Sequence, residues 1–554
     1  MSQDSLATEK KSLREAEAQG GIAKWKTYTR LSGPGWLQSA ITLGGGSLAG
    51  GLYLGVIGGY QLLWLQPLMM IFGVLMLSVI GYVALSTGEK PFQAINKHIN
   101  PVLGWGWLIA ALMANLVWAM PQFSLGTAAL QQNLGIFTDD PESKAQTGKY
   151  LCAALLFIVA SVVVWMYDSK GAKAFDIILK VMVGVIVVSF FGVVIALSGK
   201  LPWGDVLAGF IPDFSLLSEP AAGFKEKLAT TSDPDYWRGV ILGSQRDRMV
   251  TAAATAVGIN MTFLLPYSML RKGWSREHRG LATFDLSTGL FIPFLLATSC
   301  VVIASASQFH GKFDEGLLDG SKATDATKGL KGGYEKNLNA FLKHKGEGAE
   351  ASRNDKEIAA MLVSRDSLQL AASLEGLLGK GTSHTIFGIG VVGMAVSSII
   401  ILMLINGFCV TEAMGLEMSG TAHKVGSLLP GVTGALGFLW LWGDADAKFW
   451  LAVPTSVFGM VLLPIAYFTF FCMMNSKSLL GDAMPTGNRR IALNIAMGVA
   501  LVASLFGALW SIWSKAKMAG MAAFGAFILL IILGQCWHAL NKRPDRIEDA
   551  VKKK

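Results

Sequence analysis

Two short segments, each inside a long apolar stretch, hold the residues of this chain best placed to do chemistry. The first is Gly44-Gly45-Gly46-Ser47, and the second is Gly258-Ile259-Asn260-Met261-Thr262, which is followed by Pro266. Glycine costs up to about 1 kcal/mol in a helix interior, and proline removes a backbone hydrogen bond. Both segments are therefore predicted to interrupt helices. The carbonyl and N–H groups freed at such breaks can bind an ion or a small polar molecule.

The side chains expected at these breaks offer neutral oxygens and amides, with no carboxylate or imidazole. The predicted substrate-binding residues are Gly44, Gly45, Gly46, Ser47, Gln122, Asn260 and Thr262. The hydroxyls of Ser397 and Ser398 are predicted to bind a coupling ion, with Na⁺ as the candidate. A structural interpretation stands beside each of these. Small residues and amides also mediate helix packing, and membrane-helix serines often bond to their own backbone.

The elements that carry these segments must lie in an apolar solvent. The 554 residues are 52% hydrophobic and 15% charged, against roughly 25% charged in a typical soluble domain. The stretch from Leu31 to Gly88 contains no Asp, Glu, Lys or Arg, and about 20 apolar residues cross a bilayer. We therefore predict an all-α polytopic membrane protein with about twelve transmembrane helices. Their approximate positions are 31–57, 62–87, 102–134, 150–167, 174–198, 249–270, 283–306, 385–410, 426–442, 449–475, 489–513 and 518–538.

Charge predicts the orientation of these helices. With the N-terminus in the cytoplasm, the inner loops, such as 271–279, are rich in Lys and Arg, whereas short outer loops are poor in them. Both termini are therefore expected on the cytoplasmic side of a plasma or inner membrane. The predicted segments are an N-terminal tail (1–30), a first five-helix repeat (31–198), an outer loop (199–248), a second five-helix repeat (249–475) with an outer insertion (307–384), helices 11 and 12 (476–540), and a C-terminal tail (541–554).

Other functional classes find little support in the sequence. No apolar segment carries a His, Asp and Glu cluster with catalytic or metal-ligand spacing, so an enzyme is not predicted and no metal ligand is assigned. No cofactor is expected, apart from a bound Na⁺. The net charge of +9 lies mostly in loops and tails, and does not indicate nucleic-acid binding. The expected partners are the lipid bilayer and a small ion or solute, and the oligomeric state is left open.

Several motifs are similar to those of a known family. Gly33-Pro34-Gly35-Trp36-Leu37-Gln38-Ser39 and Gly58-Gly59-Tyr60-Gln61-Leu62-Leu63-Trp64 resemble the first two helices of the Nramp divalent-metal transporters. Ser86-Thr87-Gly88 with Phe92-Gln93-Ala94-Ile95 resembles the segment that follows, and 256–270 resembles the sixth helix. The resemblance implies a LeuT-type fold, with a 5+5 inverted repeat, discontinuous helices 1 and 6, and two further helices.

The sequence departs from that family at its metal ligands. The family's Asp-Pro-Gly-Asn falls on Gly44-Gly45-Gly46-Ser47, and its Met-Pro-His-Asn falls on Asn260-Met261-Thr262-Phe263. Hard divalent cations prefer charged oxygens, and transition metals prefer imidazole or sulfur. We therefore predict an Nramp-like secondary transporter of a non-divalent substrate, an anion or a small organic solute, with Na⁺ as the candidate coupling ion. The alternatives are a divalent-metal transporter (Mn, Mg or Fe type) with an atypical hydrated site, and a transport-inactive membrane sensor.

Overall fold

The structure, a computed structural model, describes residues 3–139, 146–167, 171–365, 367–375, 379–441 and 459–541. Every secondary-structure element in these ranges is a helix, with short 3₁₀ and π helices labelled η. The first elements are α1 (Gln3–Gln19), α2 (Gly21–Leu31), α3 (Pro34–Thr42), α4 (Gly45–Gly58), η1 (Gly59–Leu62), α5 (Leu65–Thr87), α6 (Pro91–His98), α7 (Pro101–Ala128), η2 (Ala129–Asn133), α8 (Thr147–Met166) and α9 (Ala172–Leu197).

The remaining elements complete the second half of the chain. The next ones are η3 (Ser198–Lys200), α10 (Trp203–Ala208), η4 (Phe214–Leu217), α11 (Ala222–Leu228), α12 (Pro234–Ala256), α13 (Ile259–Arg271), η5 (Arg276–His278), α14 (Arg279–Leu286), η6 (Ser287–Phe291) and α15 (Ile292–Phe309). They are followed by η7 (Glu315–Leu317), η8 (Gly320–Lys322), α16 (Asp325–Lys345), α17 (Arg353–Met361), α18 (Ser367–Ser373), α20 (Lys380–Ala413), α21 (Gly420–Trp440), α23 (Leu463–Met474), α24 (Lys477–Leu480), η9 (Gly481–Ala483) and α25 (Gly487–Asn541).

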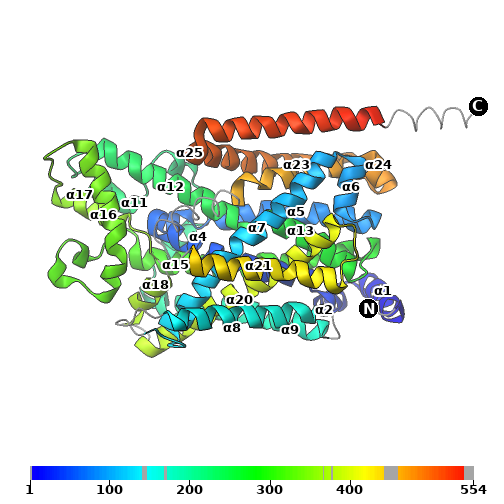
Figure 1. Ribbon diagram of the computed structural model, residues 1–554, viewed down its shortest axis with the longest axis horizontal. Coiled ribbons are helices and arrows are strands. Elements are labelled where there is room, and N and C mark those ends of the chain that lie inside the picture. Colours follow the sequence, from blue (N-terminus) through cyan, green and yellow to red (C-terminus); the bar gives the residue numbers. More distant parts are fainter. Residues whose placement is uncertain are drawn as a thin grey trace, which may run out of the picture.

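The predicted polytopic all-α architecture is confirmed. Among the described residues, eight helices are long and apolar enough to cross a membrane, and ten if each bent pair counts as one span. Helix α25 is counted once in these numbers, although it contains a non-helical residue, Lys517, that divides it into two helical parts. Figure 1 shows the two halves of α25 running in opposite directions from that break. The predicted start of helix 10 at 449 and almost all of the C-terminal tail lie outside the described residues.

The first predicted break is present where the glycines are. Helix α3 ends at Thr42, and α4 begins at Gly45 and leaves at an angle of 55°. Between them Gly44 is extended, with φ −108° and ψ −174°. It is the N-cap of α4, because its carbonyl accepts the first bond of that helix from Leu48 N at 3.1 Å. The dense glycines that follow let α4 pack closely against α12 and α15.

The second break is milder in geometry than the first. Val257 and Gly258 are both extended and separate α12 from α13. Helix α12 begins at Pro234, so 234–248, which were predicted as outer loop, are largely helical. The Asp233 side chain caps this start by accepting from Tyr236 N at 3.1 Å, and proline is favoured at the first helical position.

The two broken helices lie at the centre of the bundle. Helix α3 packs against α9, α13 and α20, and α13 packs against α5 and α7. All residues from Ile259 to Met269 in α13 are buried. Helices α8, α9 and α25 instead expose large apolar side chains, including Ile158, Val188 and Leu533, as lipid-facing helices do.

The polar segments between the spans form a cap at one end of the bundle. Figure 1 shows α11, α16 and α17 gathered at that end, whereas α1 lies at the opposite end. The buried Asp355 carboxylate joins three parts of the cap, since it accepts bonds from Ser232, Trp237 and Ser352. His310 ties the cap to α4, with Nδ1 3.0 Å from Val56 O and Nε2 accepting from Gly223 N at 3.0 Å.

Candidate functional site

The hydroxyl of Ser398 faces the first break. A Cβ built on Gly44 would lie only 2.2 Å from Ser398 Oγ, so the hydroxyl occupies the space that a side chain would take. Ser398 is buried in α20, and its Oγ has no hydrogen-bond partner among the described residues. A buried hydroxyl without a partner costs free energy, which a ligand at the break would recover. Of the two serines predicted to bind an ion, Ser398 is thus the one at the break.

Gln122 lies at the other side of the same break. Its Oε1 accepts a hydrogen bond of 3.0 Å from Gly45 N, the first amide of α4. A Cβ on Gly45 would lie 3.0 Å from that oxygen, so glycine is needed for the close approach. The side chain therefore supplies the acceptor that the N-terminus of α4 requires. Gln122 was predicted at this depth, and the structure places it here as a helix cap.

Ser47 brings together the C-terminal ends of the two half-helices. Its Oγ donates to Thr42 O of α3 and lies 3.3 Å from Thr255 O of α12. The C-terminus of a helix carries roughly half a negative elementary charge. The ends of α3 and α12 thus converge on one region and together present the equivalent of about one negative charge, made of carbonyl oxygens.

A methionine sulfur lies next to these carbonyls. Thr42 Oγ1 is 2.9 Å from Met261 Sδ, and Gly258 N donates to the same sulfur at 3.4 Å. The sequence comparison placed the family's methionine on Asn260 and so treated the thioether as replaced. The structure brings a thioether to the break from the next residue, because the flexible Met261 side chain reaches back toward α3.

Three other predicted site residues point elsewhere. Asn260 Nδ2 donates to Asn115 Oδ1 at 3.1 Å, and its Oδ1 accepts from Met261 N at 2.9 Å. The hydroxyl of Thr262 accepts from Trp107 Nε1 at 2.9 Å. Ser397 Oγ bonds back to Met394 O at 3.2 Å within α20. Asn260 and Thr262 thus join α13 to α7, and a Na⁺ site at Ser397 and Ser398 stays a prediction.

Asp285 holds the N-terminal end of α3, a role that the sequence did not suggest. Its Oδ2 accepts from Gly33 N at 3.1 Å and from Gly35 N at 2.7 Å. A Cβ on Gly35 would lie 2.2 Å from Asp285 O, so the glycine permits this approach. The carboxylate on α14 therefore caps α3, and negative charge at a helix N-terminus is stabilising.

The arrangement is suited to a cation rather than to an anion. The amide of Gly45 is bonded to Gln122, and those of Gly258 and Met261 also have side-chain acceptors. The groups at the break are the carbonyls of Thr42 and Thr255, the hydroxyls of Ser47 and Ser398, and the sulfur of Met261. In the part of the chain that the structure describes, no three His, Cys, Asp or Glu residues cluster to hold a metal ion. A cation at the break would meet the neutral groups named above.

Comparison with known proteins assigns the family. The model of the natural resistance-associated macrophage protein-like (Nramp) family matches residues 35–341 and 355–514. The chain belongs to the Nramp family. Both broken helices and the α20 segment with Ser398 lie within the matched residues, so the candidate site is part of the shared family region.

Relatives of known structure share this Nramp fold. Crystal structures of the manganese transporter of Eremococcus coleocola, one of a mutant and one with an aromatic bis-isothiourea substituted compound, are 12% and 13% identical. Each match covers 95% of this chain and 97% of that chain, with a TM-score of 0.64. The rice protein "Metal transporter Nramp2" (Oryza sativa subsp. japonica) is 27% identical over 174 residues. That match spans 30% of each chain.

The predicted substrate class is wrong. We expected a non-divalent solute or an anion, but the assignment to the Nramp family and the similarity to a metal transporter of that family favour a divalent metal ion. The error has a physical cause. Only charged side chains entered that prediction. It left out the carbonyl dipoles at the ends of α3 and α12 and the sulfur of Met261. The amides at the N-terminal ends of α4 and α13, which an anion would bind, already donate to side chains of the chain itself.

Proposed function

We propose that this Nramp-family protein carries a divalent metal ion of the Mn²⁺ or Mg²⁺ type across a membrane by alternating access. The family match over both broken helices carries the proposal. The site supports it further, because carbonyl oxygens, a hydroxyl and a thioether converge where α3 and α12 end. The protein acts as a transporter and not as an enzyme.

The ion is proposed to keep much of its water shell. Mg²⁺ dehydrates reluctantly and usually keeps several waters when proteins bind it, and carbonyl and water ligands also suit Mn²⁺. Neutral ligands cannot offset the full cost of stripping a divalent ion in a low-dielectric site. Partial hydration, together with the negative ends of α3 and α12, makes the neutral site compatible with a doubly charged ion.

The orientation proposed from charge places both termini in the cytoplasm, because basic residues gather at that end. The cap of α11, α16 and α17 then covers the outer end. Transport requires α3 and α4 to move relative to the rest of the bundle, and the contacts of Asp285 at one end and His310 at the other are the ones that must change.

Uptake into proteoliposomes tests the proposal. The purified chain is reconstituted into liposomes that enclose a dye sensitive to Mn²⁺ or Mg²⁺. Protein-free liposomes with an ionophore serve as the control for the response of the dye. Saturable uptake of at least one of the ions is expected. Met261→Leu removes the sulfur and should lower Mn²⁺ uptake more than Mg²⁺ uptake, since Mg²⁺ takes oxygen ligands. No saturable uptake of either ion would contradict the proposal and would favour a transport-inactive sensor.

A further inference from the structure

A cavity lies on the side of the bundle between α5, α14, α23 and α25, with Leu265 of α13 also in its lining. It has a volume of about 290 Å³ and is lined mostly by apolar side chains, among them Leu75, Leu286 and Leu493. Helices α14 and α25 both pack against α5, so α5 forms its floor. Helices α5, α14 and α25 belong to candidate membrane spans, so the surface around the cavity faces lipid.

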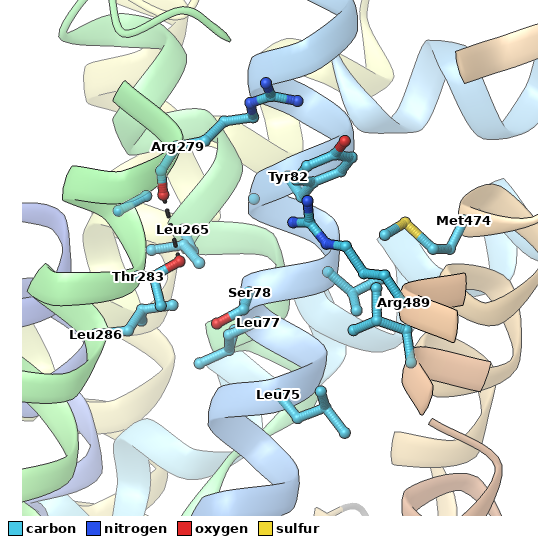
Figure 2. A pocket seen from close by; sticks show the side chains of 14 residues that line it. Leu75, Leu77, Ser78, Tyr82, Leu265, Arg279, Thr283, Leu286, Met474 and Arg489 are labelled. Carbon is cyan, nitrogen blue, oxygen red and sulfur yellow. Dashed lines mark hydrogen bonds between the residues drawn. The ribbon is translucent and has the colours of Figure 1, made fainter. Parts of the chain in front are cut away.

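Two arginines stand at one end of this cavity. The Arg279 guanidinium lies 4.7 Å from the centre of the Tyr82 ring, and the Arg489 guanidinium lies 5.8 Å from it. Figure 2 shows both guanidinium groups beside Tyr82 at one end of the pocket, with Leu75 and Leu286 toward the other end. Two positive charges therefore lie near one aromatic ring at the end of an otherwise mostly apolar cavity.

Hydrogen bonds hold Arg279 and the Tyr82 side chain in place without neutralising either arginine. Arg279 donates to Ser86 Oγ at 3.3 Å and to Arg276 O at 3.1 Å, and the Tyr82 hydroxyl donates to Ala483 O at 2.7 Å. Within the described residues, neither Arg279 nor Arg489 forms an ion pair with a carboxylate. An anion between the two would relieve their repulsion and form charge-assisted hydrogen bonds.

We propose that this cavity, named here the α5 groove, binds one anionic phospholipid of the cytoplasmic leaflet. The phosphate lies between Arg279 and Arg489, and an acyl chain follows the leucines toward the middle of the membrane. Basic pockets between transmembrane helices on the cytoplasmic side are suited to such headgroups. The placement of the two ends of the groove agrees with this. The charged end lies where α14 and α25 begin, and the apolar end lies within the membrane-spanning helices.

The bound lipid would link two parts of the bundle. Arg279 is the first residue of α14, which follows the broken helix formed by α12 and α13. Arg489 lies in the first turn of α25, which is outside the five-helix repeats. A phosphate that bonds to both would join these elements at the membrane surface. The proposal does not depend on which ion is transported.

Native mass spectrometry of the purified full chain tests the proposal. Dioleoyl phosphatidylglycerol and dioleoyl phosphatidylcholine are added separately, and the bound fraction is measured for each. The wild type should bind phosphatidylglycerol more tightly. Arg279→Gln/Arg489→Gln should weaken phosphatidylglycerol binding by about 30-fold, as expected for two basic residues near a membrane surface. Arg30→Gln/Arg276→Gln is the matched control, since both side chains are exposed at the same end, and it should bind like the wild type.

Two further arms separate the charge from the chain. Thr283→Trp places an indole in the groove at an exposed lining position and should weaken lipid binding while both arginines remain. Inorganic phosphate is added to the wild type as a competitor, and it should not displace the lipid at equal concentration. Equal binding of both lipids by the wild type would overturn the proposal, as would equal loss in the control double variant, unchanged binding in Thr283→Trp, or displacement by phosphate alone. The first and last of these need no variant to fold.

Discussion

Adding one methyl group at Gly44 is the sharpest perturbation of the candidate site. The backbone there, with φ −108°, is accessible to alanine, so Gly44→Ala changes the space rather than the fold of the chain. The new Cβ would lie 2.2 Å from Ser398 Oγ and 3.0 Å from Ile41 O. Gly46→Ala is the matched control, because its Cβ would meet nothing closer than Thr255 Cγ2 at 3.4 Å.

The magnitude follows from these contacts. Overpacking of a well-packed site costs about 1–3 kcal/mol, so Gly44→Ala should lower kcat/KM for Mn²⁺ by about 5- to 150-fold. Ser398→Ala removes one neutral ligand oxygen, worth about 0.5–1.5 kcal/mol or about 2- to 12-fold. The double variant lacks the atom at 2.2 Å, so it should transport about as well as Ser398→Ala alone. The coupling between the two changes should then exceed about 1 kcal/mol.

The assay is initial-rate Mn²⁺ uptake into proteoliposomes for the four combinations of Gly44→Ala and Ser398→Ala. Thermal unfolding and size-exclusion profiles show whether each variant is folded. Gly46→Ala should retain uptake within about twofold of the wild type. Additive losses in the double variant, or equal losses in Gly44→Ala and Gly46→Ala, would refute the placement of the Ser398 hydroxyl at the break.

Three other predictions concern charge around the site and at the two ends of the bundle. Gln122→Glu keeps an acceptor for Gly45 N and adds a negative charge at the break, so the KM for Mn²⁺ uptake should fall by about tenfold. Asp285→Asn weakens two charge-assisted bonds, so the free energy of unfolding should fall by about 1–3 kcal/mol. The control Asp176→Asn, at a partly exposed ion pair, should lower the free energy of unfolding by less. Equal melting temperatures for the two variants would contradict the role of Asp285 as the N-terminal cap of α3. Burial lowers the pKa of His310 from 6.5, and the bond to Val56 O opposes this shift in part. As the pH drops, His310 in the unfolded chain therefore takes up a proton before the buried His310 does, so the free energy of unfolding should fall as the pH drops through about 6.5. His310→Gln should remove this part of the pH dependence of the melting temperature.

Much of the fold could be predicted because lipid imposes a simple rule on sequence. A charge-free stretch such as 31–88 has to cross the bilayer, and the glycines at 44–46 mark the break that the structure contains. The early start of α12 was missed because 234–248 are polar, and hydropathy detects only the lipid-facing part of a helix. The Asp233-Pro234 pair, a cap followed by a proline at the first helical position, was the available signal.

The candidate site was predicted less completely, for reasons of distance and side-chain direction. The bond from Gly33 to Asp285 spans 252 residues, and no local pattern reports such a contact. Asn260 and Thr262 lie on the broken helix as predicted, but their side chains bond to α7. The neighbouring Met261 contacts Thr42 instead, because a register of one residue decides which side of a helix faces the break.

We propose that a divalent ion binds between the ends of α3 and α12 with neutral ligands. Anomalous diffraction at the manganese edge, from crystals of the chain grown with Mn²⁺, measures this most directly. A single strong peak is expected beside Gly44 and Ser398, within ligand or water-bridged distance of Thr42 O and Met261 Sδ. The peak should be lost in Gly44→Ala. A strong peak elsewhere, held by carboxylates, or no peak at the break at saturating Mn²⁺, would contradict the proposal.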